Sequence, residues 1–209
     1  MNAMSDGADR GYRVLVGELA CLVRLAHAAL GGATVVLTGP ADGGDGIPAA
    51  EEALAELRSR IEEDAAGTLG GRAGTVVGVH VGCEVEALGQ LVQRLLEAAW
   101  ARRRREPFDE RLLAPLRGIA DAALDLVARA AEVLDSGAPE AVADVLTELQ
   151  EIGQRQRLLY ELLLHEDHAD PDDIADLVLL SCCYRRCADH AGAIARHAGL
   201  FAHAAASAP

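Results

Sequence analysis

Three residues near the C-terminus combine ligand chemistry with helical spacing. Cys183, Cys187 and His190 lie at positions i, i+4 and i+7, so one helix face would present two thiols and an imidazole. Zinc or iron is the metal that such a face would hold. His165 and His168 lie upstream, but no second Cys/His pair at zinc-finger spacing supplies the missing ligand. We therefore expect Cys183 and Cys187 to be free, buried cysteines, and a metal site is the alternative.

Two further groups of polar residues could bind a metal ion. The segment 165–173, HEDHADPDD, offers carboxylates to a divalent ion, but it lacks the central Gly and terminal Glu of a calcium-binding hand. We predict a solvated loop there. His190, His197 and His203 are spaced by seven and six residues. We expect packing and surface histidines, of which His197 and His203 merit a metal test.

The sequence offers no constellation for catalysis. It contains no G-x-x-x-x-G-K-[ST], no G-x-S-x-G and no H-E-x-x-H, and the Glu-x-x-His repeats of di-iron bundles are missing. The glycine-rich segment 39–46 has no Lys and no preceding strand, so we expect no phosphate cradle. The prediction is a protein that is not an enzyme.

The chain is strongly acidic, with 33 acidic residues, 19 basic residues and a formal net charge of −14. Binding to nucleic acid needs a basic face, so we expect no nucleic-acid partner. The one basic block, residues 102–105, falls at a predicted helix end, where it would complement the helix dipole. The acidic surface suits docking to a basic partner.

The cysteines and the apolar segments indicate a cytoplasmic location. The chain has five cysteines, an odd number, and no secretory signal precedes them, so we expect reduced thiols packed as small apolar groups. The longest uncharged stretch, 25–41, is interrupted by Gly31, Gly32, Gly39 and Pro40. We expect no membrane-spanning helix and a protein that is peripheral to a membrane at most.

The pattern of apolar residues predicts an all-α fold. Aromatic residues make up 3% of the chain, and Ala and Leu abound, which favours helices. Apolar residues recur every three or four positions in six segments, residues 12–37, 48–69, 75–104, 109–135, 139–165 and 172–206. Val and Gly alternate as in a strand within 74–85, but an isolated strand would have no partner, so we predict a helix there too.

The six helices form two similar triplets. Residues 85–90 and 184–189 lie 99 positions apart (189 − 90 = 99), and the apolar positions of the third helix recur in the sixth at this offset. Gly39 and Gly137, which follow the first and fourth helices, lie 98 apart (137 − 39 = 98). We therefore predict two tandem three-helix repeats, residues 1–105 and 106–209, which bury their apolar stripes in one bundle.

With this repeat, the chain resembles the PhoU family, whose members are built from two tandem three-helix bundles with spectrin-repeat-like packing. The segment 184–195, YRRCADHAGAIA, is similar to the family signature Leu-Glu-Arg-Ile-Gly-Asp-His-Ala and the Asn-Ile-Ala-Glu that follows. The matching positions are Arg186, Asp189, His190, Ala191, Ile194 and Ala195. The resemblance spans nearly the whole chain and is specific in the C-terminal half, whereas Glu86 and Gly89 are the chief matches in the N-terminal half.

The family's E/D-x-x-x-D motifs, which place two carboxylates one helical turn apart to hold metal clusters, are altered here. Glu86 is followed by Gln90 in place of an acid, and Asp189 is preceded by Arg185. The resemblance implies metal binding at Asp189 and Glu86. We instead expect Arg185 to neutralise Asp189 in a surface ion pair.

The resemblance implies a regulatory adaptor that damps phosphate uptake and phosphate-starvation signalling. Its implied partners are the ATPase of the phosphate transporter and a phosphate-sensing histidine kinase, with a homodimer expected. The residues expected on the partner-binding surface are Arg185, Arg186, Asp189, His190 and Glu86. The alternative is a metal-binding helical bundle without a signalling partner, using Cys183, Cys187 and His190 or the acidic faces.

Overall fold

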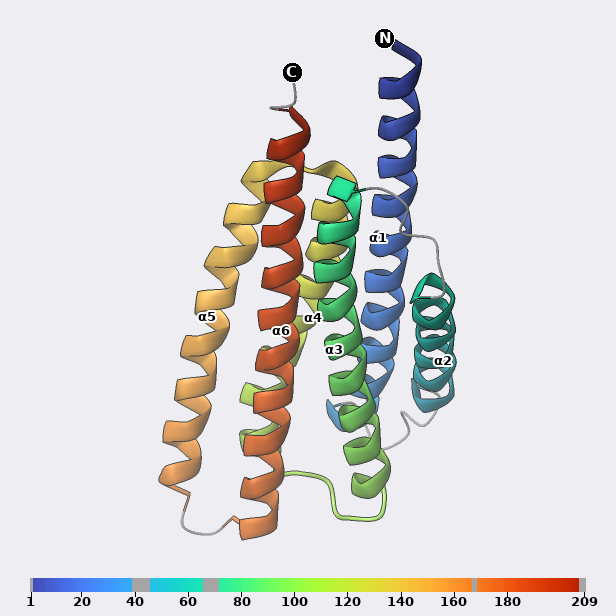
Figure 1. The fold of residues 1–209 in the computed structure, drawn as a ribbon. Helices are drawn as coiled ribbons and strands as arrows, with labels where there is room; N and C mark the ends of the chain where they lie inside the picture. Colours follow the sequence, from blue (N-terminus) through green and yellow to red (C-terminus); the bar gives the residue numbers. More distant parts are fainter. Residues whose placement is uncertain (1, 39–45, 66–71, 167–168, 207–209) are drawn as a thin grey trace.

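The computed structural model describes residues 2–38, 46–65, 72–166 and 169–206, and within these ranges the chain is all-helical and contains no strand. The predicted all-α fold with six helices is therefore confirmed. The helices are α1 (Asn2–Thr38), α2 (Gly46–Ala65), α3 (Arg72–Arg102), α4 (Glu110–Ser136), α5 (Pro139–Leu164) and α6 (Pro171–Ala206), as Figure 1 shows.

The helix bounds agree with the sequence pattern except in α1. Residues 74–85, where Val and Gly alternate, belong to α3 and are helical. Helix α1 continues through Gly31 and Gly32 to Thr38, in agreement with the predicted segment 12–37. At Gly31 a Cβ atom would lie 3.8 Å from Cδ2 of Leu124 on α4, an ordinary van der Waals distance, so the packing of the two helices does not depend on glycine at this position. Helix α1 begins at Asn2, however, ten residues before the predicted start.

Four helices form the centre of the bundle and two flank it. Helix α1 packs against α3 and α4, and α6 packs against the same two helices, so these four form a ring. Helix α2 covers α1 and α3, while α5 covers α4 and α6 on the opposite side (Figure 1). Buried residues from all six helices belong to one hydrophobic cluster.

Helix α4 has the most complete local signals and the most regular buried stripe. The Asp109 side chain accepts a hydrogen bond from the backbone N–H of Arg111 at 2.8 Å and caps the helix start. Gly137 ends the helix with a φ of 62°, a left-handed conformation that glycine adopts without strain. The stripe between these caps is buried at Leu112, Leu116, Ile119, Ala123, Val127, Ala130 and Leu134.

One segment, Val14–Thr38 of α1, is long and apolar enough to cross a membrane by length and composition. Half of its most apolar window is buried inside the bundle, and core helices of soluble proteins pass the same test. One such segment is weak evidence for a membrane span.

The basic block at the end of α3 makes specific ion pairs as well as lying at a helix terminus. Nη1 of Arg102 lies 2.6 Å from Asp173 of α6, and Arg105 lies 2.9 Å from both Asp173 and Asp176. The Arg102 guanidinium also stacks 3.6 Å above the ring centre of Phe108. The acidic residues at the start of α6 therefore bind arginines at the end of α3, where both helices reach the same end of the bundle (Figure 1).

Candidate functional site

The residues expected on the partner-binding surface of α6 divide into exposed and internally bonded side chains. Arg186 and Asp189 are exposed, whereas Arg185 and His190 are partly buried. Nε of Arg185 donates to Oδ1 of Asp189 at 3.1 Å, which confirms the expected ion pair. Asp189 is thus already neutralised by a cation of its own helix.

Arg185 lies across a glycine of the neighbouring helix. A Cβ atom at Gly153 of α5 would lie 3.5 Å from Cζ of Arg185 and would clash with Nη1, so the glycine leaves room for the guanidinium in this position. The guanidinium therefore rests on the α5 backbone. A cation here is incompatible with a metal cluster that shares Asp189, because like charges repel.

His190 points away from the exposed face and toward α3. Its Nδ1 lies 2.6 Å from Oε2 of Glu84, and both side chains are about three-quarters buried or more. Glu84 was not singled out from the sequence, because its partner lies 106 positions away. The His190 side chain consequently helps to join α6 to α3, and little of its surface is available to a partner protein.

A second pair of residues joins α3 and α6 close to this contact. The rings of His80 and His197 stack with centres 5.0 Å apart and planes 9° from parallel. Burial lowers the pKa of His197, and His80 and Arg196 lower it further while Glu84 raises it. The stack is thus most stable while His197 is neutral. His203 lies outside the residues whose side chains the structure describes.

Glu86 lies on a different groove from Arg185 and Asp189. It lines a pocket of about 270 Å³ between α2 and α3, whereas Arg185 contacts α5. The other residues of the pocket are Leu54, Leu57, Arg58, Ile61, Gly89 and Gln90. The five residues expected to form one surface are therefore distributed over two helix pairs.

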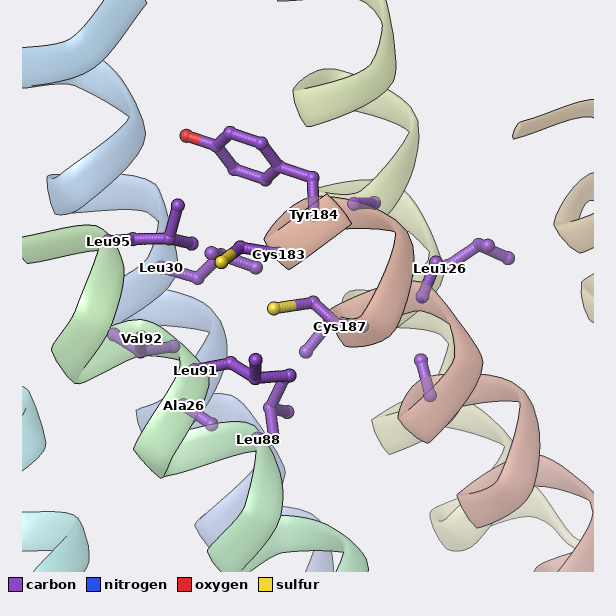
Figure 2. Packing of buried hydrophobic residues seen from close by; sticks show 14 of the residues in the cluster. Ala26, Leu30, Leu88, Leu91, Val92, Leu95, Leu126, Cys183, Tyr184 and Cys187 are labelled. Atoms are coloured by element: carbon purple, nitrogen blue, oxygen red, sulfur yellow. The ribbon is translucent and has the colours of Figure 1, made fainter. Parts of the chain in front are cut away.

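Cys183 and Cys187 of α6 are buried as free thiols, as expected. Cys187 is fully buried and Cys183 is nearly so, and Figure 2 shows their sulfur atoms among Leu30, Leu88, Leu91 and Leu95. Burial raises the pKa of both thiols, so neither is a thiolate ready to bind metal. In the part of the chain that the structure describes, no group of three or more His, Cys, Asp or Glu side chains is arranged to hold a metal ion.

The expectation that all five thiols pack as small apolar groups is wrong for two of them. Cys83 and Cys182 are exposed. The Sγ of Cys182 lies 3.2 Å from the hydroxyl of Tyr160, which also accepts from Gln156 at 2.8 Å. The two cysteines lie 99 positions apart on exposed faces of α3 and α6.

The described residues of the acidic segment 165–173 make contacts that stabilise the fold. Oδ1 of Asp170 accepts from the backbone N–H of Asp172 at 2.9 Å, and Asp173 binds the arginines of α3. Residues 167 and 168 lie outside the described residues, so the predicted solvated loop is tested only at its edges.

One polar contact in the core was not foreseen from the sequence. The Tyr184 hydroxyl, fully buried, donates to Oγ1 of Thr34 at 3.0 Å, and Thr34 donates in turn to the carbonyl of Leu30 at 2.8 Å. Figure 2 shows the Tyr184 ring above the buried cysteines. This pair fixes α6 against α1, because an unpaired hydroxyl in the core would be costly.

Compared with known proteins, the sequence matches no protein-family model and no curated protein. The likeness to PhoU proteins therefore rests on residues 184–195 and on the internal repeat.

Proposed function

We propose that the chain is a PhoU-like regulatory adaptor built from two three-helix units, and that it acts by docking to other proteins. By the resemblance, its partners are the ATPase of the phosphate transporter and a phosphate-sensing histidine kinase, and its effect is to damp phosphate uptake and starvation signalling. The proposed location is the cytoplasm, at the membrane face where these partners lie, and the proposed assembly is a homodimer.

The observation that carries the proposal is the matching burial of α3 and α6. At the offset of 99 residues, every buried apolar position of α3 from Val81 to Ala99 except Leu91 meets a buried position of α6. The pairs are Val81 with Leu180, Val85 with Tyr184, Leu88 with Cys187, Leu91 with His190 as the one partly buried partner, Val92 with Ala191, Leu95 with Ile194, Leu96 with Ala195 and Ala99 with Ala198. Equal burial at equivalent positions supports a duplicated unit.

The buried positions of α1 correspond to those of α4 in the same way, at an offset of 97 residues (116 − 19 = 97). Leu19, Leu22, Ala26, Leu30, Ala33 and Leu37 correspond to Leu116, Ile119, Ala123, Val127, Ala130 and Leu134, and all twelve are buried. Within each half the three helices also contact one another, as α1 with α2 and α3, and α4 with α5 and α6. These contacts support two units of like design that share one core.

The exposed face of α6 is the surface that we assign to docking. Arg186 and Asp189 are exposed and can exchange contacts with solvent for contacts with a partner. Arg185 and His190 hold internal partners and so position this face, while Glu86 contributes on the pseudo-equivalent face of α3. Charges at the rim of an interface govern partner choice and association rate more than affinity.

Affinity purification from phosphate-replete cells tests the proposal. The wild-type chain should recover the transporter ATPase or the histidine kinase, and the variant Arg186→Ala/Asp189→Ala should recover less of both. The control Arg157→Ala/Asp144→Ala removes one base and one acid from exposed positions of α5 and should behave as wild type. Recovery of neither protein by the wild-type chain ends the proposal.

A further inference from the structure

The groove between α2 and α3 is open and amphipathic. Its floor consists of Leu54, Leu57 and Ile61, and Gly89 lets α2 approach because a Cβ atom there would lie 3.3 Å from Cδ2 of Leu57. Its volume is about 270 Å³, enough for one long side chain and too small for a folded segment.

The polar rim of this groove holds an acid with its hydrogen-bonding capacity unused. Glu86 and Gln90 are exposed and lie one turn apart on α3. Among the described residues, Glu86 makes no hydrogen bond and no ion pair. A carboxylate that lines a groove with a free amide one turn away presents two acceptors to the same ligand.

The equivalent place in the second half of the chain is already filled. At the offset of 99 residues, Glu86 corresponds to Arg185 and Gln90 corresponds to Asp189. There the Arg185 side chain lies between α5 and α6, with its guanidinium on Gly153 and its Nε bonded to Asp189. The chain itself therefore demonstrates how a guanidinium fits between the second and third helix of one such unit.

We propose that the groove between α2 and α3 binds an arginine side chain of a partner protein, held by Glu86 and Gln90. This inference rests on the two-unit arrangement of the proposed function. The carboxylate of Glu86 accepts a charge-assisted, bidentate hydrogen bond from the guanidinium. The carbonyl oxygen of Gln90 accepts from a remaining N–H, and the arginine methylenes cover Leu57 and Ile61. The net charge of −14 attracts a basic partner segment over longer range.

Arginine fits this groove better than lysine. The planar guanidinium matches a carboxylate and an amide one turn apart, whereas an ammonium group is a strongly hydrated point charge. Arg58 also lines the groove and donates from Nη2 to Oε1 of Gln93 at 3.2 Å, so its charge opposes an incoming cation. Arg58 consequently lowers the affinity and selects for ligands that bind Glu86 closely.

The test is an NMR titration of the full chain with the peptide acetyl-Ala-Ala-Arg-Ala-Ala-amide and with its Lys and Gln counterparts. The Arg peptide should produce saturable shifts at the Gly89 amide and the Gln90 side-chain amide, the Lys peptide weaker ones, and the Gln peptide none. Absence of saturable shifts with the Arg peptide, or equal shifts with all three peptides, overturns the proposal.

Variants assign the binding to this groove. Glu86→Gln should weaken binding by roughly two- to fivefold, as expected for an exposed ion pair. The control Glu132→Gln removes an equal charge from an exposed position of α4, outside the groove, and should leave the affinity unchanged. Arg58→Met should strengthen binding because it removes the competing cation. Unchanged affinity in Glu86→Gln overturns the proposal.

One variant should gain a site. Arg185→Ala vacates the second groove and leaves Asp189 unpaired, so the Arg peptide should now also shift the Gly153 amide. If Arg185→Ala gains no shift there, the equivalence of the two grooves is refuted. Failure of the peptide titration would leave the adaptor proposal intact, since that proposal is judged by recovery of the transporter ATPase and the kinase through α6.

Discussion

Nδ1 of His190 and Oε2 of Glu84 lie 2.6 Å apart, and this contact joins α6 to α3. His190 belongs to the segment that resembles the PhoU signature, whereas Glu84 belongs to no recognised motif. The side chains are 20% and 26% exposed, so the hydrogen bond is shielded from water on most sides. Its position makes it part of the contact between the two halves of the chain.

A double-mutant cycle should detect this coupling. Glu84→Ala and His190→Ala should each lower the free energy of unfolding, and the double variant should lose less than the sum by about 0.5–1.5 kcal/mol. Urea denaturation followed by circular dichroism measures all four proteins. The control Glu86→Ala removes an acid that lies two residues from Glu84 on α3 and has no partner among the described residues. It should change the free energy of unfolding by less than about 0.5 kcal/mol. Additive losses would contradict the predicted coupling.

The stability of the fold should fall as the pH drops below the usual histidine value of 6.5. Burial lowers the pKa of His197, with His80 and Arg196 lowering it further and Glu84 opposing, and burial also lowers the pKa of His27 against the opposing charge of Asp125. Below pH 6.5 the unfolded chain therefore binds protons that the folded chain excludes, and the stability present above this pH is lost progressively.

Chemical denaturation between pH 7.5 and 5 measures this dependence. His197→Gln and His27→Gln should each flatten the fall in unfolding free energy, because each removes one group that titrates differently in the two states. An identical pH profile in both variants and the wild type would assign the dependence to other groups.

Thiol modification should separate the cysteines into two classes. Exposed Cys83 and Cys182 should react with iodoacetamide in the native protein, whereas Cys183 and Cys187 should react only after unfolding, because burial hides them and raises the pKa of both thiols. Peptide mass spectrometry after timed labelling reads out each site. Native labelling of Cys187 at the rate of Cys182 would show that the core opens near α6.

Removing the Tyr184 hydroxyl should lower the free energy of unfolding less than removing the hydroxyl of its partner, Thr34. Tyr184→Phe removes one hydrogen bond and leaves Thr34 bonded to Leu30, so it should cost about 1 kcal/mol of unfolding free energy. Thr34→Val leaves the buried Tyr184 hydroxyl without this hydrogen-bond partner and should lower the free energy of unfolding by about 1–3 kcal/mol. Combining the two should restore part of the loss, measured by urea denaturation. A double variant that loses more unfolding free energy than the sum of the two single losses would refute the hydrogen bond between Tyr184 and Thr34.

The arginines at the end of α3 should differ in importance according to their burial. Arg102 is 10% exposed and bonds to Asp173 and the carbonyl of Glu106, so Arg102→Met should lower the unfolding free energy by about 2 kcal/mol. Arg104→Met removes an exposed charge two positions away and should have an effect below about 0.5 kcal/mol. Equal effects of the two substitutions would mean that the ion pairs with α6 add no stability.

The sequence by itself determined the helices of this protein. A helix is held by hydrogen bonds between residues four positions apart and by caps at its ends, so apolar spacing and signals such as Asp109 and Gly137 are enough to find it. The ion pair of Arg185 and Asp189 was predictable for the same reason, since its members lie one turn apart on one helix. The first helix was the exception at its start, because α1 begins at Asn2, ten residues before the apolar pattern begins.

Only the tertiary structure decided which helix faces meet. Glu84 and His190 are separated by 106 positions and Tyr184 and Thr34 by 150, and no local spacing links them. The division of Glu86 and Arg185 between two grooves likewise depends on how α2 and α5 flank the central helices. An apolar stripe indicates that one face of a helix is buried. The partner of each polar side chain, in contrast, is fixed by the packing of helices that lie far apart in the chain.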